Sequence, residues 1–276
     1  MSSNSLFVLA TPIGNMDDIT LRALEVLKEV NIIAAEDTRH SRHLLSRHGI
    51  NTPLTALHEH NEEQAAPRLV EKLLAGQSIA LVSDAGTPLL SDPGYRLVRL
   101  AVAAGIRVSP VPGPSAITAA LSVSGLATDR FTFEGFLPSR RSARIKLLES
   151  LQNEERSTVM FESSHRILAS IEDMITVMGE ERQAAICREM TKQFETVLRG
   201  TLKELLQQLT EDSNQCKGEF VIVLAAGHSE HAEDMVRALA LASALQEHLS
   251  SSQAARVSAR ICDVSRRELY RLMEQD

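Results

Sequence analysis

LFVLATPIGN (residues 6–15) is the first of three stretches in which a short apolar run leads into a turn containing Pro and Gly. The other two are IALVSDAGTP (79–88) and IRVSPVPGPSA (106–116), and each turn precedes a helix-like segment. In an open α/β sheet, the turns after parallel strands line one crevice, where ligands bind. Gly and Pro let the backbone pass close to a ligand and hold it rigid. The three turns therefore predict a ligand site.

Strand-like and helix-like segments alternate through the first half of the chain, which is typical of a parallel sheet with covering helices. We interpret as strands the runs 6–11, 32–35, 79–82 and 106–111, and as helices 20–30, 38–48, 61–75, 94–104 and 114–124. Gly follows several of these helices, where a left-handed C-cap suits it. We assign residues 1–125 to a first α/β domain.

The pattern changes after residue 125. Further strands are expected at 158–161, 183–187, 195–198 and 219–224, with helices at 141–152, 164–178 and 202–209. These segments predict a second α/β domain, 126–227. A linker-like segment follows, and then three helix-like stretches at 234–248, 253–262 and 265–274 without a strand between them. Their lengths suit a helix-turn-helix unit, so we assign residues 233–276 to a C-terminal helical domain.

Composition limits the class of protein. The chain has 276 residues, of which 43% are hydrophobic, so two modest domains can each bury a core. No apolar run reaches the roughly 18 residues of a membrane helix, and we expect no secretory signal and no membrane partner. The three Cys residues form no CxxC pair, which favours a reducing cytoplasm. A net charge of −7 argues against a protein that coats itself in nucleic acid, but it leaves room for local basic patches. The absence of Trp and the few Tyr and Phe residues argue against a stacking-type RNA-binding module.

The absence of two nucleotide-binding motifs limits the classes of ligand that the site can bind. No GxGxxG follows the first strand and no GxxxxGK[ST] occurs, so dinucleotide and P-loop sites are disfavoured. The turns offer small residues, backbone groups and one carboxylate, Asp84. Such a site suits S-adenosylmethionine, which combines an adenosine, an amino acid end and a sulfonium cation. The alternative is that these turns are ordinary α/β loops.

Three segments carry clustered basic residues. EDTRHSRH (36–43) follows the second strand, and its Arg residues can grip a phosphodiester while a carboxylate accepts a proton from a hydroxyl. SRRSARIK (139–146) suits a helix start that contacts phosphate. Residues 253–271 hold five Arg and two acidic residues. For each, a solvated helix face is the alternative. The His residues lack a convincing ligand pattern, so we expect no metal.

Nine motifs in order resemble a known family: TPIGN, AEDTR, SDAGTP, DPG, PGPSA, EGFLP, FESSHR, REMTK and KGE, between residues 11 and 219. The chain resembles the bacterial 16S rRNA (cytidine ribose-2′-O)-methyltransferases, a group of the tetrapyrrole methylase superfamily, over residues 6–227. The resemblance implies two α/β domains with S-adenosylmethionine in the cleft between them, and a homodimer. It also implies methylation of a decoding-centre cytidine of small-subunit ribosomal RNA, within the assembled subunit. The C-terminal helices resemble the helix-turn-helix extension of this group.

The resemblance assigns roles to individual positions. In the group, Tyr often stands where this chain has Phe161, so no role falls to a phenol. Asp37 and Glu162 are our candidates for the general base that takes the hydroxyl proton. By the resemblance, cofactor contacts are expected at Pro12, Asp84, Thr87, Ser115, Ala116, Glu162 and Met190. From the basic segments, and not from the resemblance, we expect RNA contacts at Arg39, Arg42, Arg140, Arg141, Arg266 and Arg267. DNA lacks the 2′-hydroxyl and is not an expected substrate.

Two other functions stay open. One is a tetrapyrrole C-methyltransferase of the same superfamily, although a small macrocycle needs neither the basic segments nor the C-terminal helices. The other is a non-enzymatic nucleic-acid binder that uses residues 253–271. Binding of S-adenosylmethionine distinguishes the binder from either enzyme.

Overall fold

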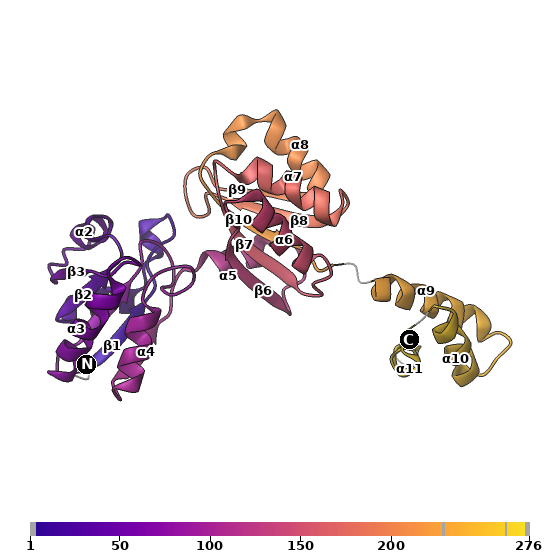
Figure 1. The fold of residues 1–276 in the computed structure, drawn as a ribbon, viewed down its shortest axis with the longest axis horizontal. Coiled ribbons are helices and arrows are strands. Elements are labelled where there is room, and N and C mark those ends of the chain that lie inside the picture. The colour runs from indigo at the N-terminus through magenta and orange to yellow at the C-terminus, as the bar shows by residue number, and fades with distance from the viewer. Residues whose placement is uncertain (1–3, 228–229, 263, 274–276) are drawn as a thin grey trace.

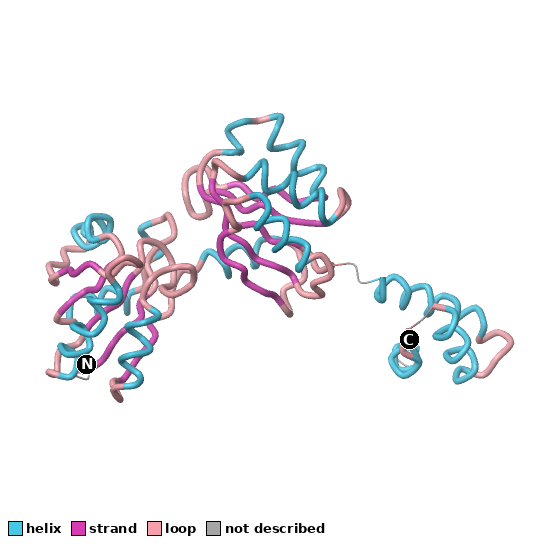
Figure 2. Tube along the Cα trace, in the orientation of Figure 1, coloured by secondary structure: helices cyan, strands magenta, loops and turns pink. Residues whose placement is uncertain are grey.

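The computed structural model describes residues 4–227, 230–262 and 264–273, which form three units along the chain (Figure 1). Two α/β units come first, each built on a five-stranded sheet, and a helical unit follows. Loops of the first unit gather on the side that faces the second unit (Figure 2). Within the described ranges, the helices are all too short or too polar to cross a membrane.

The first sheet is fully parallel, with the strand order β3-β2-β4-β1-β5. Its inner strands are buried on both faces, which explains their continuous apolar sequence. The predicted strand at 6–11 ends early, because Thr11 forms an isolated bridge with Gly86 instead. The strands are β1 (Ser5–Leu9), β2 (Ile32–Ala35), β3 (Leu54–Ala56), β4 (Ile79–Val82) and β5 (Arg107–Val111).

Helices cover both faces of the first sheet. On one face, Ile33 of the sheet shares a core with Leu44 of α2. On the other, the neighbouring Ile32 shares a core with Leu69 of α3. Alternate strand residues thus point to opposite cores, as in doubly wound sheets. The first face carries α1 (Leu21–Glu29) and α2 (Thr38–Arg47), and the second carries α3 (Glu62–Leu74) and α4 (Tyr95–Ala103).

Helix α5 (Ala116–Ser124) belongs to the second sheet, although the division at residue 125 assigns it to the first domain. Its buried side chains recur at helical spacing, and Ile117 and Leu121 share a core with Val221 and Val223 of the second sheet. In packing terms the first unit therefore ends just before α5.

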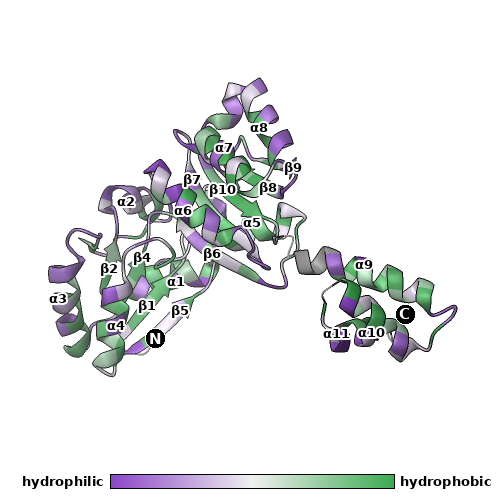
Figure 3. Ribbon diagram, turned by 45° about the vertical axis from the view of Figure 1, so that its right-hand side comes forward, coloured by the Kyte–Doolittle hydropathy of each residue, from purple (hydrophilic) through white to green (hydrophobic). Residues whose placement is uncertain are grey.

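The second sheet is mixed, with the order β6-β7-β10-β8-β9 and only β6 and β7 parallel. Its apolar residues form one core with α5 and another with the three helices on the opposite face. Figure 3 shows apolar residues along the inner strands and polar residues on much of the outer helix α8. The strands are β6 (Phe131–Phe136), β7 (Ser157–Ser163), β8 (Gln183–Arg188), β9 (Thr196–Thr201) and β10 (Glu219–Leu224); the helices are α6 (Arg141–Leu151), α7 (Ile167–Met178) and α8 (Leu202–Glu211).

The C-terminal unit consists of α9 (Glu230–Leu245), α10 (Ser251–Ile261) and α11 (Arg266–Met273). The three expected helices are therefore present, with shifted ends. Ala238, Ala255 and Leu269 are fully buried among them. Small Ala residues at these contacts let the helices approach closely.

A tight contact joins the first turn to the second unit. The Asn15 backbone N–H donates to the Thr191 hydroxyl at 3.0 Å. A Cβ on Gly14 would lie 2.5 Å from Lys192 Cγ and 2.8 Å from Thr191 Oγ1, closer than real contacts allow. The sequence needs Gly at residue 14 because the two units approach there.

We predict that Gly14→Ala breaks this contact between the first turn and the second unit. Overpacking of this kind costs about 1–3 kcal/mol, and the Asn15 amide should lose its bond to Thr191. Hydrogen exchange of the peptide containing Asn15 would measure the loss. Gly49→Ala is the control, because Gly49 is exposed and has a left-handed φ of 63° but no atom within 4 Å of the new methyl. Equal exchange in Gly14→Ala and the wild type would contradict the prediction.

Candidate functional site

The three turns predicted from the sequence meet at the carboxyl edge of the first sheet. Thr11 and Gly86 exchange two backbone hydrogen bonds, with N–O distances of 2.9 and 3.0 Å. The Thr87 hydroxyl donates to the Pro114 carbonyl at 3.1 Å. These bonds join the first turn to the second and the second to the third. The turns therefore form one wall.

A cavity of about 600 Å³ lies between this wall and the second unit. This volume falls within the range of about 300–1,000 Å³ that is usual for small-molecule sites. The first unit and α5 contribute Asp84, Thr87, Ser115 and Ala116, and the second sheet and its loops contribute Glu162 and Met190. Six of the seven positions expected to contact the cofactor thus line one cavity. The seventh, Pro12, lines a smaller cavity beside it.

One side of the larger cavity is acidic. Glu36, Asp84 and Asp92 all line it. Burial raises the pKa of Asp92 to about 6; a hydrogen bond from Ser83 opposes this rise, and the charges of Glu36 and Asp84 add to it. The pKa of Glu36 is also raised, first by burial and then by Asp84. Carboxylates that repel one another in this way favour a cationic ligand.

Apolar side chains line other parts of the cavity, including Ile13, Ile117 and Met190. Phe161 also lines it, and its ring meets Phe133 and Phe136 edge-on, with centroids 5.0 and 5.4 Å away. Apolar and aromatic surface suits the faces of an adenine, and the acidic side suits a sulfonium and an ammonium group. The residues present therefore fit S-adenosylmethionine.

Asp37 lies beside the cavity and lines neither of the two described here. Its carboxylate caps α2 by accepting the Arg39 backbone N–H at 2.8 Å, and it forms an ion pair with the Arg39 guanidinium at 2.7 Å. These bonds hold the pKa of Asp37 well below its usual range. A carboxylate so stabilised in its ionised form is a weak base.

Glu162 lines the cavity, but its side chain has no exposed surface. The carboxylate pairs with Arg166 at 2.7 Å and accepts from the Ser170 hydroxyl at 2.5 Å and the Ser163 backbone N–H at 2.7 Å. Three donors thus fix both oxygens. The contacts indicate that Glu162 holds the end of β7 in place.

The basic positions singled out in the sequence lie in different surroundings. Arg39 and Arg42 are exposed on α2, next to the smaller cavity. Arg141 pairs with Asp173 at 2.8 Å, and Asp173 also holds the buried Arg144. The structure thus gives Arg141 a role in packing α6 on α7, although its side chain stays 71% exposed.

The other basic positions are exposed. Arg140 lies just before α6, and Arg266 and Arg267 lie at the start of α11, where Arg266 donates to the Ser252 hydroxyl at 3.0 Å. Figures 1 and 3 both show the helical unit on the far side of the second unit from the first. In this arrangement Arg266 and Arg267 lie away from the cavity.

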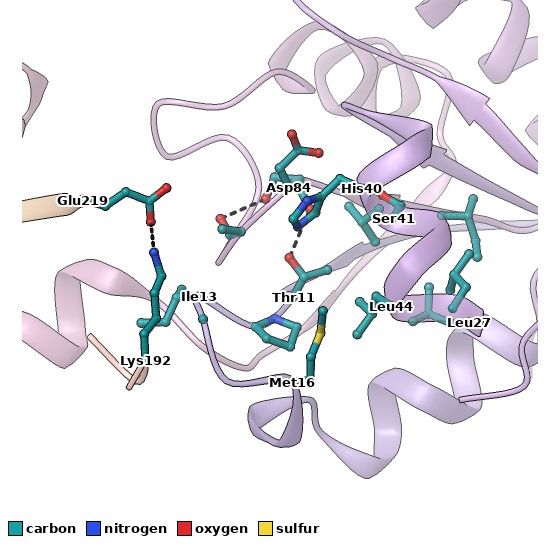
Figure 4. A pocket seen from close by; sticks show the side chains of 17 residues that line it. Thr11, Ile13, Met16, Leu27, His40, Ser41, Leu44, Asp84, Lys192 and Glu219 are labelled. Atoms are coloured by element: carbon teal, nitrogen blue, oxygen red, sulfur yellow. Dashed lines mark hydrogen bonds and ion pairs between the residues drawn. The ribbon is translucent and has the colours of Figure 1, made fainter. Parts of the chain in front are cut away.

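A smaller cavity of about 210 Å³ adjoins the first one, and Figure 4 shows its lining. Lys192 lines both cavities, and its ammonium pairs with Glu189 at 2.8 Å and Glu219 at 2.7 Å. Across the described ranges, the His, Cys, Asp and Glu residues form no cluster of three or more that would hold a metal ion.

Glu36 and Asp92 are the site residues that the sequence analysis missed. Both lie in motifs quoted above, AEDTR and DPG, but neither motif indicates by itself that its carboxylate is buried beside others. The position of Glu36 directly after a strand, at the same edge as the three turns, is the one sequence feature that points to a place in the site.

Comparison with known proteins agrees with this geometry. Residues 5–206 match the family described as Tetrapyrrole (Corrin/Porphyrin) Methylases. A protein of Xylella fastidiosa (strain Temecula1) named Ribosomal RNA small subunit methyltransferase I is 52% identical, and the match covers 96% of this chain and 97% of that protein. Proteins of the same name from Pseudomonas aeruginosa and Escherichia coli O157:H7 are 48% and 49% identical over 98% of this chain and 96% and 94% of their own lengths.

Solved structures show the same fold at low sequence identity. Uroporphyrin-III-C-methyltransferase from Thermus thermophilus is 18% identical with a TM-score of 0.56, covering 80% of this chain and 94% of that one. Diphthine synthase is 18% identical with a TM-score of 0.58, covering 80% and 89%. The fold, the cavity between the two sheets and the extent of the match lead to one conclusion: this chain belongs to the tetrapyrrole methylase family, whose methyltransferases use S-adenosylmethionine.

Proposed function

We propose that this chain methylates the ribose 2′-hydroxyl of a cytidine in the decoding centre of small-subunit ribosomal RNA. The observation that carries the proposal is that six separately predicted positions line one cavity with an acidic side. The substrate class rests on the relatives, which are about half identical over nearly the whole chain and bear the name Ribosomal RNA small subunit methyltransferase I. We further propose that the protein acts in the cytoplasm, as a homodimer, on the assembled subunit.

S-adenosylmethionine, when bound, supplies a methyl group on a sulfonium cation. We propose that Asp84 and Glu36 attract the cationic end, and that Thr87, Ser115, Ala116 and Met190 form the rest of its site, with Pro12 at the junction of the two cavities. Holding two reactants in line lowers the barrier by about 7–11 kcal/mol in well-oriented systems. The main task of these residues is therefore to orient.

We propose Asp92 as the group that accepts the hydroxyl proton. A general base works best when its pKa lies near the working pH, and burial raises the pKa of Asp92 to about 6. Asp37 and Glu162 stay predictions for this role, but Arg39 and Arg166 occupy their carboxylates. The predicted RNA contacts also stay predictions: Arg39, Arg42, Arg140, Arg141, Arg266 and Arg267.

The proposed reaction predicts transfer of radiolabelled methyl from S-adenosylmethionine to unmodified small subunits. Alkaline or ribonuclease digestion should leave the label in a dinucleotide, because a methylated 2′-oxygen cannot attack the adjacent phosphodiester, whereas a methyl group on the base would leave the label in a mononucleotide. Free ribosomal RNA and uroporphyrinogen III serve as alternative acceptors. Label on the macrocycle and none on the subunit would replace this proposal with the tetrapyrrole alternative.

Asp84→Asn should weaken S-adenosylmethionine binding about 10- to 100-fold, because bonds to a charged group contribute about 1.5–3 kcal/mol. The amide oxygen can still accept the Asp37 backbone N–H, which is 3.0 Å from Asp84 Oδ1, so the wall should keep its shape. Calorimetry measures the affinity. Asp129→Asn, at an exposed position outside both cavities, is the matched control. Unchanged affinity in Asp84→Asn would remove Asp84 from the site.

Asp92→Asn should lower kcat by about 10²- to 10⁴-fold, the usual contribution of a general base. In the wild type, kcat/KM should fall as the pH drops below about 6, because the Asp92 carboxylate is then protonated. The variant should lack this acid limb. Both expectations can be tested by measuring methyl-transfer rates on small subunits from about pH 5 to about pH 9. If Asp92→Asn keeps the fall in kcat/KM at low pH, another group accepts the hydroxyl proton.

A further inference from the structure

The smaller cavity has a polar part, here called its mouth, and an apolar floor. Thr11, His40, Ser41 and Asp84 line the mouth (Figure 4); His40 is exposed there, whereas Thr11 and Ser41 are buried. Most floor residues are side chains from β2, β4, α1 and α2, and they are nearly or fully buried. They are Leu27, Ile33, Leu44, Leu45 and Val82.

The two cavities share one wall. Ile13, Asp84, Ala85, Lys192 and Glu219 line both. A molecule in the smaller cavity therefore lies against the same side chains as a molecule in the larger one. No other residues are common to both linings among the described part of the chain.

The volume and chemistry of the smaller cavity indicate the size of its ligand. At about 210 Å³, the cavity lies below the usual range for whole small-molecule ligands. The apolar floor suits the flat face of a ring, and the hydroxyl, imidazole and carboxylate groups at the mouth suit a hydrogen-bonding edge. A single nucleobase has both features. Asp side chains accept a hydrogen bond from the cytosine amino group in nucleic-acid complexes.

We propose that the smaller cavity receives the base of the target nucleotide, a pyrimidine, so that its ribose lies at the shared wall. The inference rests on the proposed function, and it names the substrate subsite of that reaction. Enzymes that do chemistry on a base turn it out of the stack into a pocket that reads its edge. The inference extends this arrangement to a base whose ribose is the reacting group. The cavity provides such a pocket next to the cofactor site.

Helix α2 connects this pocket with the RNA backbone. His40 and Ser41 line the cavity, and the exposed Arg39 and Arg42 flank them on the same helix. A base held by this face of α2 would keep its flanking phosphates near those guanidinium groups. Phosphate contacts of this kind position a nucleic acid without reading its sequence.

Two matched pairs of variants test the inference. Ser41→Leu fills the cavity, whereas Ser46→Leu places the same side chain on an exposed turn of the same helix. His40→Ala removes a mouth residue, and His43→Ala removes an exposed neighbour that lines neither cavity. We expect Ser41→Leu to slow methyl transfer to small subunits about 100-fold, as misplacement of a substrate does. Affinity for S-adenosylmethionine, measured by calorimetry, should not change and also reports that each variant folds.

A binding measurement adds a readout that needs no turnover. Cytidine 5′-monophosphate added to ¹⁵N-labelled protein should shift the amide resonances of His40 and Ser41 and leave that of Ser46 in place. The same titration of Ser41→Leu should give no shift at His40. Adenosine 5′-monophosphate, whose base is larger, should shift these resonances less.

The outcomes separate the inference from the function on which it rests. If the wild type methylates subunits and Ser41→Leu does so equally fast, the inference is wrong and the proposed function stands. Two further results would overturn the inference. One is loss of cofactor binding in Ser41→Leu together with loss of methyl transfer. The other is that cytidine 5′-monophosphate shifts only resonances of residues around the larger cavity. If the wild type methylates no subunits, the proposed function fails and the subsite fails with it.

Discussion

Two backbone hydrogen bonds between Thr11 and Gly86 impose the constraint on which the site depends. They lie beyond the ends of β1 and β4, where the sheet itself no longer holds the chain. Each such bond contributes only about 0.5–1.5 kcal/mol to stability, so their importance is geometric. They bring the first turn onto the second, and the bond from Thr87 to the Pro114 carbonyl adds the third. Both cavities are built on this wall.

Carboxylates in this protein have two distinct surroundings. Asp37 and Glu162 are matched by Arg39 and Arg166, and their charges are satisfied within the fold. Around the larger cavity, Asp92 is paired with no cation; its neighbours there are like charges, and Ser83 supplies only a hydroxyl. Ionised carboxylates crowded in this way cost free energy, and a bound cation relieves that cost. The acidic side of the cavity thus favours a sulfonium ligand before any specific contact forms.

One strained loop of the second unit contributes to both cavities through Lys192. Glu189 and Thr191 have φ values of 50° and 65°, which non-glycine residues adopt at a cost. Lys192 holds this loop by pairing with Glu189 and Glu219, and Thr191 accepts the Asn15 backbone N–H from the first unit. Positive-φ residues held in this way by their neighbours are typical of functional sites. The cavities accordingly depend on the placement of both sheets.

The sequence by itself determined the alternating elements of the first sheet and the three turns at its edge, because apolar periodicity and turn residues are local signals. It indicated the family through the resemblance of its nine motifs. It did not reveal β3, with three partly exposed residues, or β6, where Gly135 interrupts the pairing with β7. Tertiary structure alone decided that α5 packs on the second sheet, that Asp173 binds Arg141 and that Asp92 has a raised pKa. Each of these depends on burial and charge from segments far along the chain, which no local pattern encodes.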